Sequence, residues 1–172
     1  MANYLDIVPL WVELECCEAT LNESFDNSGL LARVTYKSPL PLRKAAERLA
    51  RYATREGGYD FPGYTAGERD QSAVVYLWGS EGFGKVPAVG FACFRLRDYS
   101  DTGPFQTLCW VWLHPYCRRQ GLLKRAWPHF VREHGEFLVE PPLSRGMHGF
   151  LSEHTNYWAW LEKMLEPNRA HQ

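Results

Sequence analysis

Residues 111–123 read Val-Trp-Leu-His-Pro-Tyr-Cys-Arg-Arg-Gln-Gly-Leu-Leu and contain the most informative pattern of the chain. An apolar run leads into His114-Pro115, a basic pair follows at Arg118-Arg119, and Gly121 precedes a run of helix-forming residues. This order predicts a strand, a turn and a helix start in direct succession. Free backbone N–H groups and the helix dipole attract phosphate at such a start, and Gly121 lets a ligand approach the backbone closely. A plain strand–loop–helix corner with solvated arginines fits the residues about as well.

The same stretch resembles the acetyl-coenzyme A signature of the GNAT superfamily of N-acetyltransferases. In that signature a hydrophobic strand and His-Pro precede Arg-x-x-Gly-x-Gly/Ala. The match covers Arg118, Arg119, Gln120, Gly121 and Leu122, whereas Leu123 stands where the family has Gly or Ala. The resemblance extends more loosely over residues 72–154. It implies an α/β (α+β) fold with a mixed, mostly antiparallel central sheet, flanking helices and strands that splay apart at the cofactor site.

The resemblance also implies acetyl-CoA as co-substrate. The backbone of the strand that carries the signature would meet the pantetheine arm and polarise the thioester carbonyl, and Leu123 would crowd the pyrophosphate. The implied cofactor-binding residues are Trp112, Leu113, His114, Arg118, Arg119, Gln120, Gly121, Leu122, Leu123 and Ser144.

The residues that would perform the chemistry match the family less well. Ser144 stands where the family has Asn at the start of its second helix, and Leu151 or Phe150 occupies the place of the Tyr that protonates the leaving thiolate. The resemblance therefore leaves Tyr157, Ser144 or solvent as the acid. The segment 140–144 is also faintly similar to the Asp-Pro-Thr-Pro run of the cohesin acetyltransferases.

Two residues are candidates for the general base that takes a proton from an amine acceptor. Glu140 follows a short apolar strand and is the preferred one, although a helix-capping or solvated carboxylate is an equally good interpretation of it. His114 lies at the end of the cofactor strand and titrates near neutrality, although many such histidines are simply packed.

The flanking segments supply the other elements. The periodicity predicts strands at residues 7–15, 30–36, 72–78, 88–96, 105–114 and 137–140, and helices at 42–56, 122–134, 144–154 and 157–165. In the strand at 105–114, Leu108, Trp110 and Trp112 share one face, and both faces are apolar. This predicts a central strand covered on both sides.

The length of 172 residues suits a single domain. We expect residues 1–70 to form the acceptor side, 71–156 to form the acetyl-CoA-binding core, and 157–172 to form a C-terminal helix and tail. The tryptophans at 158 and 160 would lie in the core or on the surface of a homodimer.

The bulk composition argues against several classes of protein. A net charge of −1 disfavours nucleic-acid binding, and no apolar run is long enough to span a membrane. Five cysteines without CxxC spacing indicate a reducing, cytoplasmic compartment. Cys109, His114 and Cys117 lack the paired spacing of a zinc site, so no metal is expected.

The sequence thus predicts an enzyme that transfers an acetyl group from acetyl-CoA directly to a small-molecule or protein amine. The alternative from another class is a non-catalytic acyl-CoA-binding or protein-interaction module on the same fold. The missing Tyr and the presence of Leu123 favour that alternative.

Overall fold

The computed structural model describes residues 31–67, 71–79, 88–99 and 103–169, and the chain divides into two compact units, one ending at Leu138 and the other beginning at Val139. The strand expected at 7–15 lies outside the described residues.

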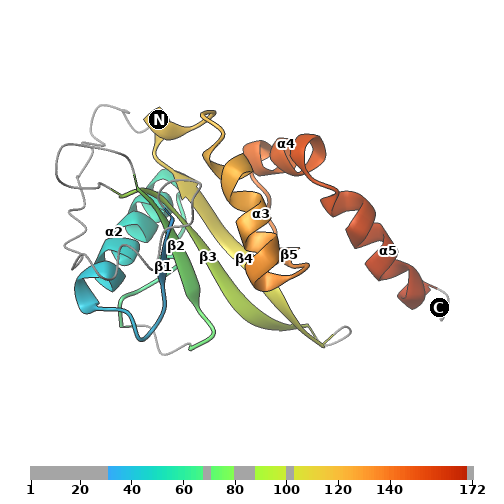
Figure 1. Cartoon of the computed structure of the whole chain (residues 1–172), viewed down its shortest axis with the longest axis horizontal. Helices are drawn as coiled ribbons and strands as arrows, with labels where there is room; N and C mark the ends of the chain where they lie inside the picture. The colour runs from blue at the N-terminus through green and yellow to red at the C-terminus, as the bar shows by residue number, and fades with distance from the viewer. Residues whose placement is uncertain (1–30, 68–70, 80–87, 100–102, 170–172) are drawn as a thin grey trace. The chain divides into compact units, whose positions relative to one another are not determined.

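The sheet has strand order β1-β2-β3-β4-β5, which is also the order along the chain, and the boundary between the two units falls within β5 (Figure 1). The pairs β1–β2, β2–β3 and β3–β4 are antiparallel, which confirms the mostly antiparallel sheet. The strands are β1 (Leu31–Val34), β2 (Val74–Gly79), β3 (Ala88–Tyr99), β4 (Gly103–Leu113) and β5 (Leu138–Val139).

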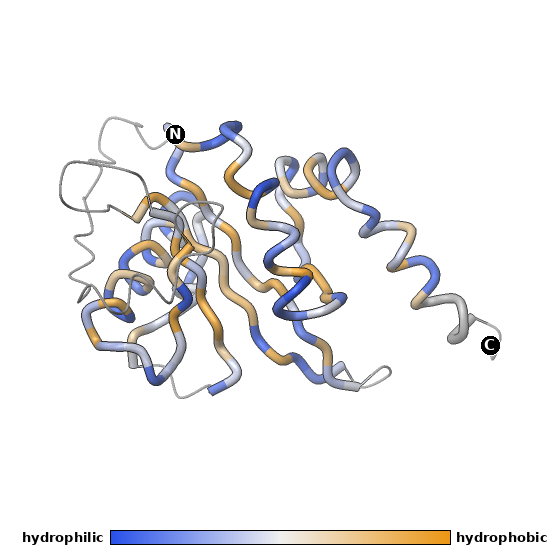
Figure 2. The backbone as a smooth tube through the Cα atoms, in the orientation of Figure 1, coloured by the Kyte–Doolittle hydropathy of each residue, from blue (hydrophilic) through white to orange (hydrophobic). Residues whose placement is uncertain are grey.

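One face of the sheet is covered by α2 (Leu40–Gly57). Proline within its first turn favours the helix start, and Gly58 ends it in the left-handed conformation, with φ of 68°. The apolar stripe of α2 packs on alternate residues of the strands, as the period of two in a strand requires. Figure 2 shows the apolar strands beside α2, along which hydrophobic and hydrophilic residues alternate. The buried cluster includes Leu42, Ala46, Leu49, Ala53, Val75, Leu77, Phe91, Cys93 and Trp112.

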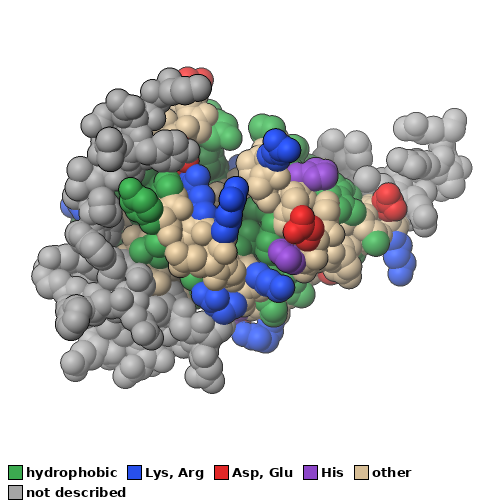
Figure 3. Space-filling view, turned by 90° about the horizontal axis from the view of Figure 1, so that it is seen from above, with side chains coloured by type: hydrophobic (Ala, Val, Ile, Leu, Met, Phe, Trp, Pro, Cys, Tyr) green, Lys and Arg blue, Asp and Glu red, His purple; other side chains and the backbone are tan. Residues whose placement is uncertain are grey.

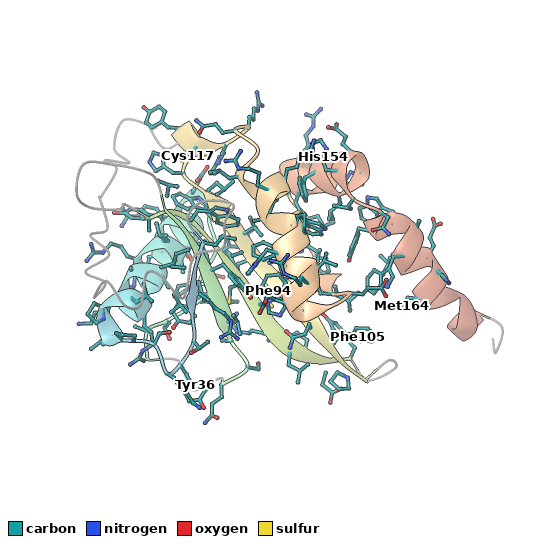
Figure 4. The ribbon with its side chains drawn as sticks, in the orientation of Figure 1. Tyr36, Phe94, Phe105, Cys117, His154 and Met164 are labelled. Carbon is teal, nitrogen blue, oxygen red and sulfur yellow. The ribbon has the colours of Figure 1, made fainter. Side chains whose placement is uncertain are left out.

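The other face carries α3 (Leu122–His134). Phe130 is fully buried there, with ring centroids 4.9 Å from Tyr76, 5.1 Å from Phe94 and 5.9 Å from Trp78. Phe94 projects from β3 on this side (Figure 4). These aromatic rings hold α3 against the sheet, because large buried rings contribute most of the apolar area of such a contact.

A β-bulge in β4 corrects the expected assignment of its faces. Cys93 pairs with Trp110, whereas the next residue, Phe94, pairs with Leu108, so Cys109 has no partner of its own. Directly opposed residues share a face. Leu108 therefore lies on the α3 side and Trp110 on the α2 side, and the prediction that they share a face was wrong. An extra residue that shifts the alternation leaves no mark in the hydrophobic pattern.

Buried residues lie on both faces of β4, since Leu108 is buried on the α3 side and Trp112 on the α2 side. Of its eleven residues, only Thr107, Leu108 and Trp112 are buried. Several apolar side chains of β4 are therefore only partly buried by the described residues.

The second unit contains α4 (Arg145–His154) and α5 (Tyr157–Arg169). Ser144 caps α4, because its Oγ accepts a hydrogen bond from the Met147 N–H at 3.1 Å. Tyr157 is buried at the start of α5, and its ring lies 5.8 Å from that of Trp160. Both helices lie where the periodicity predicts them.

A half-buried histidine on α3 predicts a pH dependence of stability. His134 Nε2 lies 2.9 Å from the Tyr76 hydroxyl, and its ring stacks on Phe94 at 4.0 Å. Burial, followed by the charge of Arg33, lowers the pKa of His134 from 6.5 to about 4. The unfolded chain therefore takes up this proton first, and the free energy of unfolding should fall by at most about 3 kcal/mol between pH 6.5 and 4.

Urea denaturation at several pH values checks this expectation, with His134→Gln as the comparison. The substituted protein should lack this part of the pH dependence. An identical pH profile in both proteins would contradict the assignment.

Candidate functional site

The loop between β4 and α3 forms the candidate site. It begins with the short helix η2 (Pro115–Cys117) and ends at Gly121, the N-cap of α3. Arg119 and Gly121 both have positive φ, 61° and 75°. Positive φ is uncommon for a residue with a side chain, and such residues concentrate at ligand sites. Cys117 marks this loop in Figure 4, and Figure 3 views the molecule from the side on which it lies.

Among the described residues, no side chain caps the backbone donors at the start of α3. The first intrahelical bond runs from the Arg125 N–H to the Gly121 carbonyl at 2.9 Å, so the N–H groups of residues 122–124 have no partner within the helix. Gly121 offers no side-chain acceptor, and the first turn holds no acidic residue. Such a helix start favours an anion.

Several cations surround this helix start. Arg119, Lys124 and Arg125 are exposed. Arg125 Nη1 also donates to the Gln120 carbonyl at 3.0 Å, and Gln120 Nε2 donates to the Tyr116 carbonyl at 2.8 Å. Sequence reasoning missed Arg125, although its place one helical turn after Gly121 was a usable signal.

Arg118 behaves differently from its neighbours. Its Nη2 forms an ion pair with Glu56 Oε2 at 2.7 Å, and its Nε donates to the Leu113 carbonyl at 2.8 Å. The same Glu56 oxygen accepts a hydrogen bond from Trp112 Nε1 at 2.6 Å. Arg118 is therefore bound to α2 and β4, although the sequence predicted it as a cofactor ligand. No pattern in the sequence pointed to Glu56.

The register of β4 separates the three residues whose backbone was expected to meet the pantetheine arm. The His114 N–H donates to the Val89 carbonyl at 2.8 Å, so residues 112 and 114 direct their backbone groups toward β3. Leu113 lies between them and faces the opposite edge, and its carbonyl accepts from Arg118 rather than from β3. Of Trp112, Leu113 and His114, only Leu113 has a backbone N–H that points away from β3.

The ring of His114 is half-buried between charged groups. Burial lowers its pKa, and the Arg118 charge lowers it further, against an opposing effect of Glu56. Nδ1 accepts from the Tyr116 N–H at 3.4 Å, which places the proton of the neutral ring on Nε2. Among the described residues, buried Nε2 has no hydrogen-bond partner. This geometry makes Nε2 a donor and leaves it without the lone pair of a base.

The remaining predicted residues belong to the second unit. Glu140 is half-buried directly after β5, and Ser144 is the exposed cap of α4. The Tyr157 hydroxyl accepts a hydrogen bond from the Val139 N–H at 3.0 Å, and Tyr157 is buried. Its bond to the main chain gives Tyr157 a structural role in this unit.

The parts of the chain that the structure describes contain no helix with the length and apolar character needed to cross a membrane. They also contain no group of three or more His, Cys, Asp or Glu placed to hold a metal ion.

Comparison with solved structures identifies the fold. No protein-family model and no curated protein matches the chain. The xEco2 acetyltransferase domain, solved with a lysine–CoA conjugate, is 14% identical with a TM-score of 0.58, over 76% of this chain and 89% of that domain.

Two further similar structures have lower TM-scores. A ribosomal-protein-alanine N-acetyltransferase from Brucella melitensis is 17% identical with a TM-score of 0.46, over 73% of this chain and 89% of its own. An aminoglycoside N-acetyltransferase in complex with CoA is 16% identical with a TM-score of 0.47, over 71% of this chain and 87% of its own.

The likeness to the xEco2 domain is one of fold, and it agrees with the α/β fold expected from the sequence. The chain therefore has the fold of the GNAT N-acetyltransferases.

Proposed function

We propose that this protein transfers an acetyl group from acetyl-CoA to an amine. The observation that carries the proposal is the uncapped start of α3, which follows two residues of positive φ and is surrounded by exposed cations. A diphosphate suits such a site, because it accepts hydrogen bonds from several backbone N–H groups at once.

Each part of the loop has a distinct role in this proposal. The N–H groups of residues 122–124 and the guanidinium groups of Arg119 and Arg125 bind the diphosphate of the donor. Acetyl-CoA supplies the acetyl group as a thioester. The outward N–H of Leu113 is the candidate donor to the carbonyl oxygen, which becomes negatively charged during transfer.

The acceptor is proposed to be a primary amine on a small molecule or a protein. The xEco2 domain, which shares the fold, was solved with a conjugate that joins lysine to CoA. Glu140 is our candidate for the base that deprotonates the amine, and Ser144 or solvent is proposed to protonate the thiolate.

Substitution of Gly121 tests the proposed donor site. A side chain there would be strained by the φ of 75° and would point toward Arg125 Nη1 at 3.4 Å. Gly121→Val should therefore abolish the rise in melting temperature that acetyl-CoA causes, a rise that corresponds to about 2.7 kcal/mol at 100 times the dissociation constant.

Gly58→Val is the matched control. Gly58 ends α2 with φ of 68°, and a Cβ there would contact nothing within 4 Å. Both variants should lose roughly 1–3 kcal/mol of stability to backbone strain. Only the Gly121 variant should lose the response to acetyl-CoA, and a full response in that variant would rule out the loop as the donor site.

A non-catalytic acyl-CoA-binding module remains the second candidate, because Tyr157 is used structurally. Turnover of acetyl-CoA with a panel of primary amines separates the two functions. Binding without turnover of any amine would favour the module.

A further inference from the structure

We propose that Glu56 is a positioning residue of the donor site, acting through Arg118, an inference that rests on the proposed function. Glu56 lies in the last turn of α2, 62 residues before Arg118 in the sequence. The proposal assigns Arg118 to holding the loop and leaves the binding of phosphate to other groups.

The contacts of Glu56 bring α2, β4 and the loop together. A single oxygen, Oε2, accepts from Trp112 Nε1 at 2.6 Å and from Arg118 Nη2 at 2.7 Å. The side chains of Glu56 and Arg118 are 22% and 38% exposed, so this pair is better shielded from water than a surface ion pair. Hydrogen bonds between charged groups are the stronger kind, and shielding strengthens them further.

Arg118 extends the linkage to the edge of β4. Its Nε donates to the Leu113 carbonyl at 2.8 Å while Nη2 holds Glu56. The guanidinium group is planar and rigid, so these two contacts fix its orientation. The orientation of Arg118 in turn fixes the place where the chain leaves η2 and enters Arg119-Gln120-Gly121.

The electrostatics support the same division of roles. Burial alone would raise the pKa of Glu56, but hydrogen bonds from Arg118 and Trp112 outweigh it and lower the pKa. The carboxylate is therefore charged at neutral pH and offsets the charge of Arg118. Arg119 has no such partner among the contacts of the described residues, and it is exposed beside the start of α3.

The linkage also bears on Leu113, the candidate donor to the thioester carbonyl. The guanidinium group of Arg118 holds the carbonyl of the same residue whose N–H faces outward. Loss of Glu56 should therefore disturb both the phosphate-binding loop and the edge of β4.

A second acidic residue on α2 provides a matched control. Glu47 pairs with Arg51 one turn away on the same helix, and it accepts a hydrogen bond from the Ala66 N–H. In the described structure these two partners, Arg51 and Ala66, lie outside β4 and the loop. Glu47→Gln thus removes an ion pair from α2 without touching the proposed linkage.

Isothermal titration with CoA tests the proposal in wild-type protein and in Glu56→Ala, Glu56→Gln, Arg118→Gln, the double variant Glu56→Gln/Arg118→Gln, and Glu47→Gln. Glu56→Ala should weaken CoA binding about tenfold or more, whereas Glu56→Gln, which keeps one acceptor oxygen, should lose less. The double variant should bind no worse than the weaker single variant, because both substitutions break one linkage. Glu47→Gln should stay within about twofold of wild type.

Salt dependence separates positioning from direct phosphate binding. The loss caused by Arg119→Ala should shrink as salt rises, because exposed charge–phosphate attraction is screened. The loss caused by Arg118→Gln should change less with salt. Melting temperatures without CoA identify any variant that fails to fold, and Glu56→Gln keeps the test valid if Glu56→Ala does so.

The outcomes that overturn the inference are distinct from those that overturn the proposed function. Wild-type protein that binds no CoA would overturn both. CoA binding by wild-type protein with unchanged affinity in both Glu56 variants would overturn the positioning role alone. Additive losses in the double variant would also overturn it.

Discussion

Replacing Glu140 with Gln should lower the turnover of acetyl-CoA about 10²- to 10⁴-fold while leaving the affinity for CoA nearly unchanged. The change keeps the shape of the side chain and removes its ability to accept a proton from the amine. Steady-state turnover with an amine that the wild-type protein acetylates, together with isothermal titration of CoA, measures the two quantities separately.

His114→Gln is the comparison for this experiment. Nδ1 of His114 is occupied by the Tyr116 N–H, so we expect a smaller loss, within about tenfold. Burial and the charge of Arg118 lower the pKa of His114, so a base at this position would stay unprotonated to a pH below 6.5. A large loss in His114→Gln, with a normal rate in Glu140→Gln, would make His114 the base and contradict the role proposed for Glu140.

Equal and full activity in both variants would leave neither residue as base. Transfer would then rely on solvent. Absence of turnover in the wild-type protein with every amine would instead support the non-catalytic module.

Phe130→Ala should lower the free energy of unfolding by about 3–5 kcal/mol, the range for removing a fully buried aromatic side chain. Phe130 contacts rings from β2 and β3, including Tyr76, Trp78 and Phe94. The cavity would open between α3 and the sheet. Urea denaturation measures the effect as a lower midpoint with an unchanged slope.

Val131 supplies the control on the same helix, because it is 43% exposed. Val131→Ala should change the free energy of unfolding by less than about 0.5 kcal/mol. Similar small effects in both variants would show that α3 does not pack on the sheet through Phe130.

The order of elements could be predicted from the sequence because each element carries its own periodicity. The apolar stripe of α2 indicates a helix, Gly58 marks the end of α2, and Gly121 marks the start of α3. The bulge at Cys109 could not be predicted, since it depends on which residue of β3 faces each residue of β4. An apolar strand reads the same with or without the extra residue.

One part of the candidate site could likewise be predicted from the sequence, and another part could not. The loop from Arg118 to Leu123 could be found because its residues are adjacent and match a signature. The partnership of Arg118 with Glu56 could not, because 62 residues separate them and each is an ordinary charged residue in its own segment. A local pattern shows which groups are present, whereas only the fold shows which of them are already occupied.

The agreement between strand order and chain order has a consequence for folding. The strands from β2 to β4 pair with their neighbours in sequence, so this part of the sheet grows by closing short loops. Contacts between nearby segments form quickly, since little chain entropy is lost in making them. The bond between Glu56 and Arg118 requires that α2, the paired strands β2 to β4 and the turn after β4 are already in place. It therefore belongs among the last contacts to form. The loop that meets the donor would then be shaped only once the rest of the first unit has folded, so that partly folded chains lack the binding site.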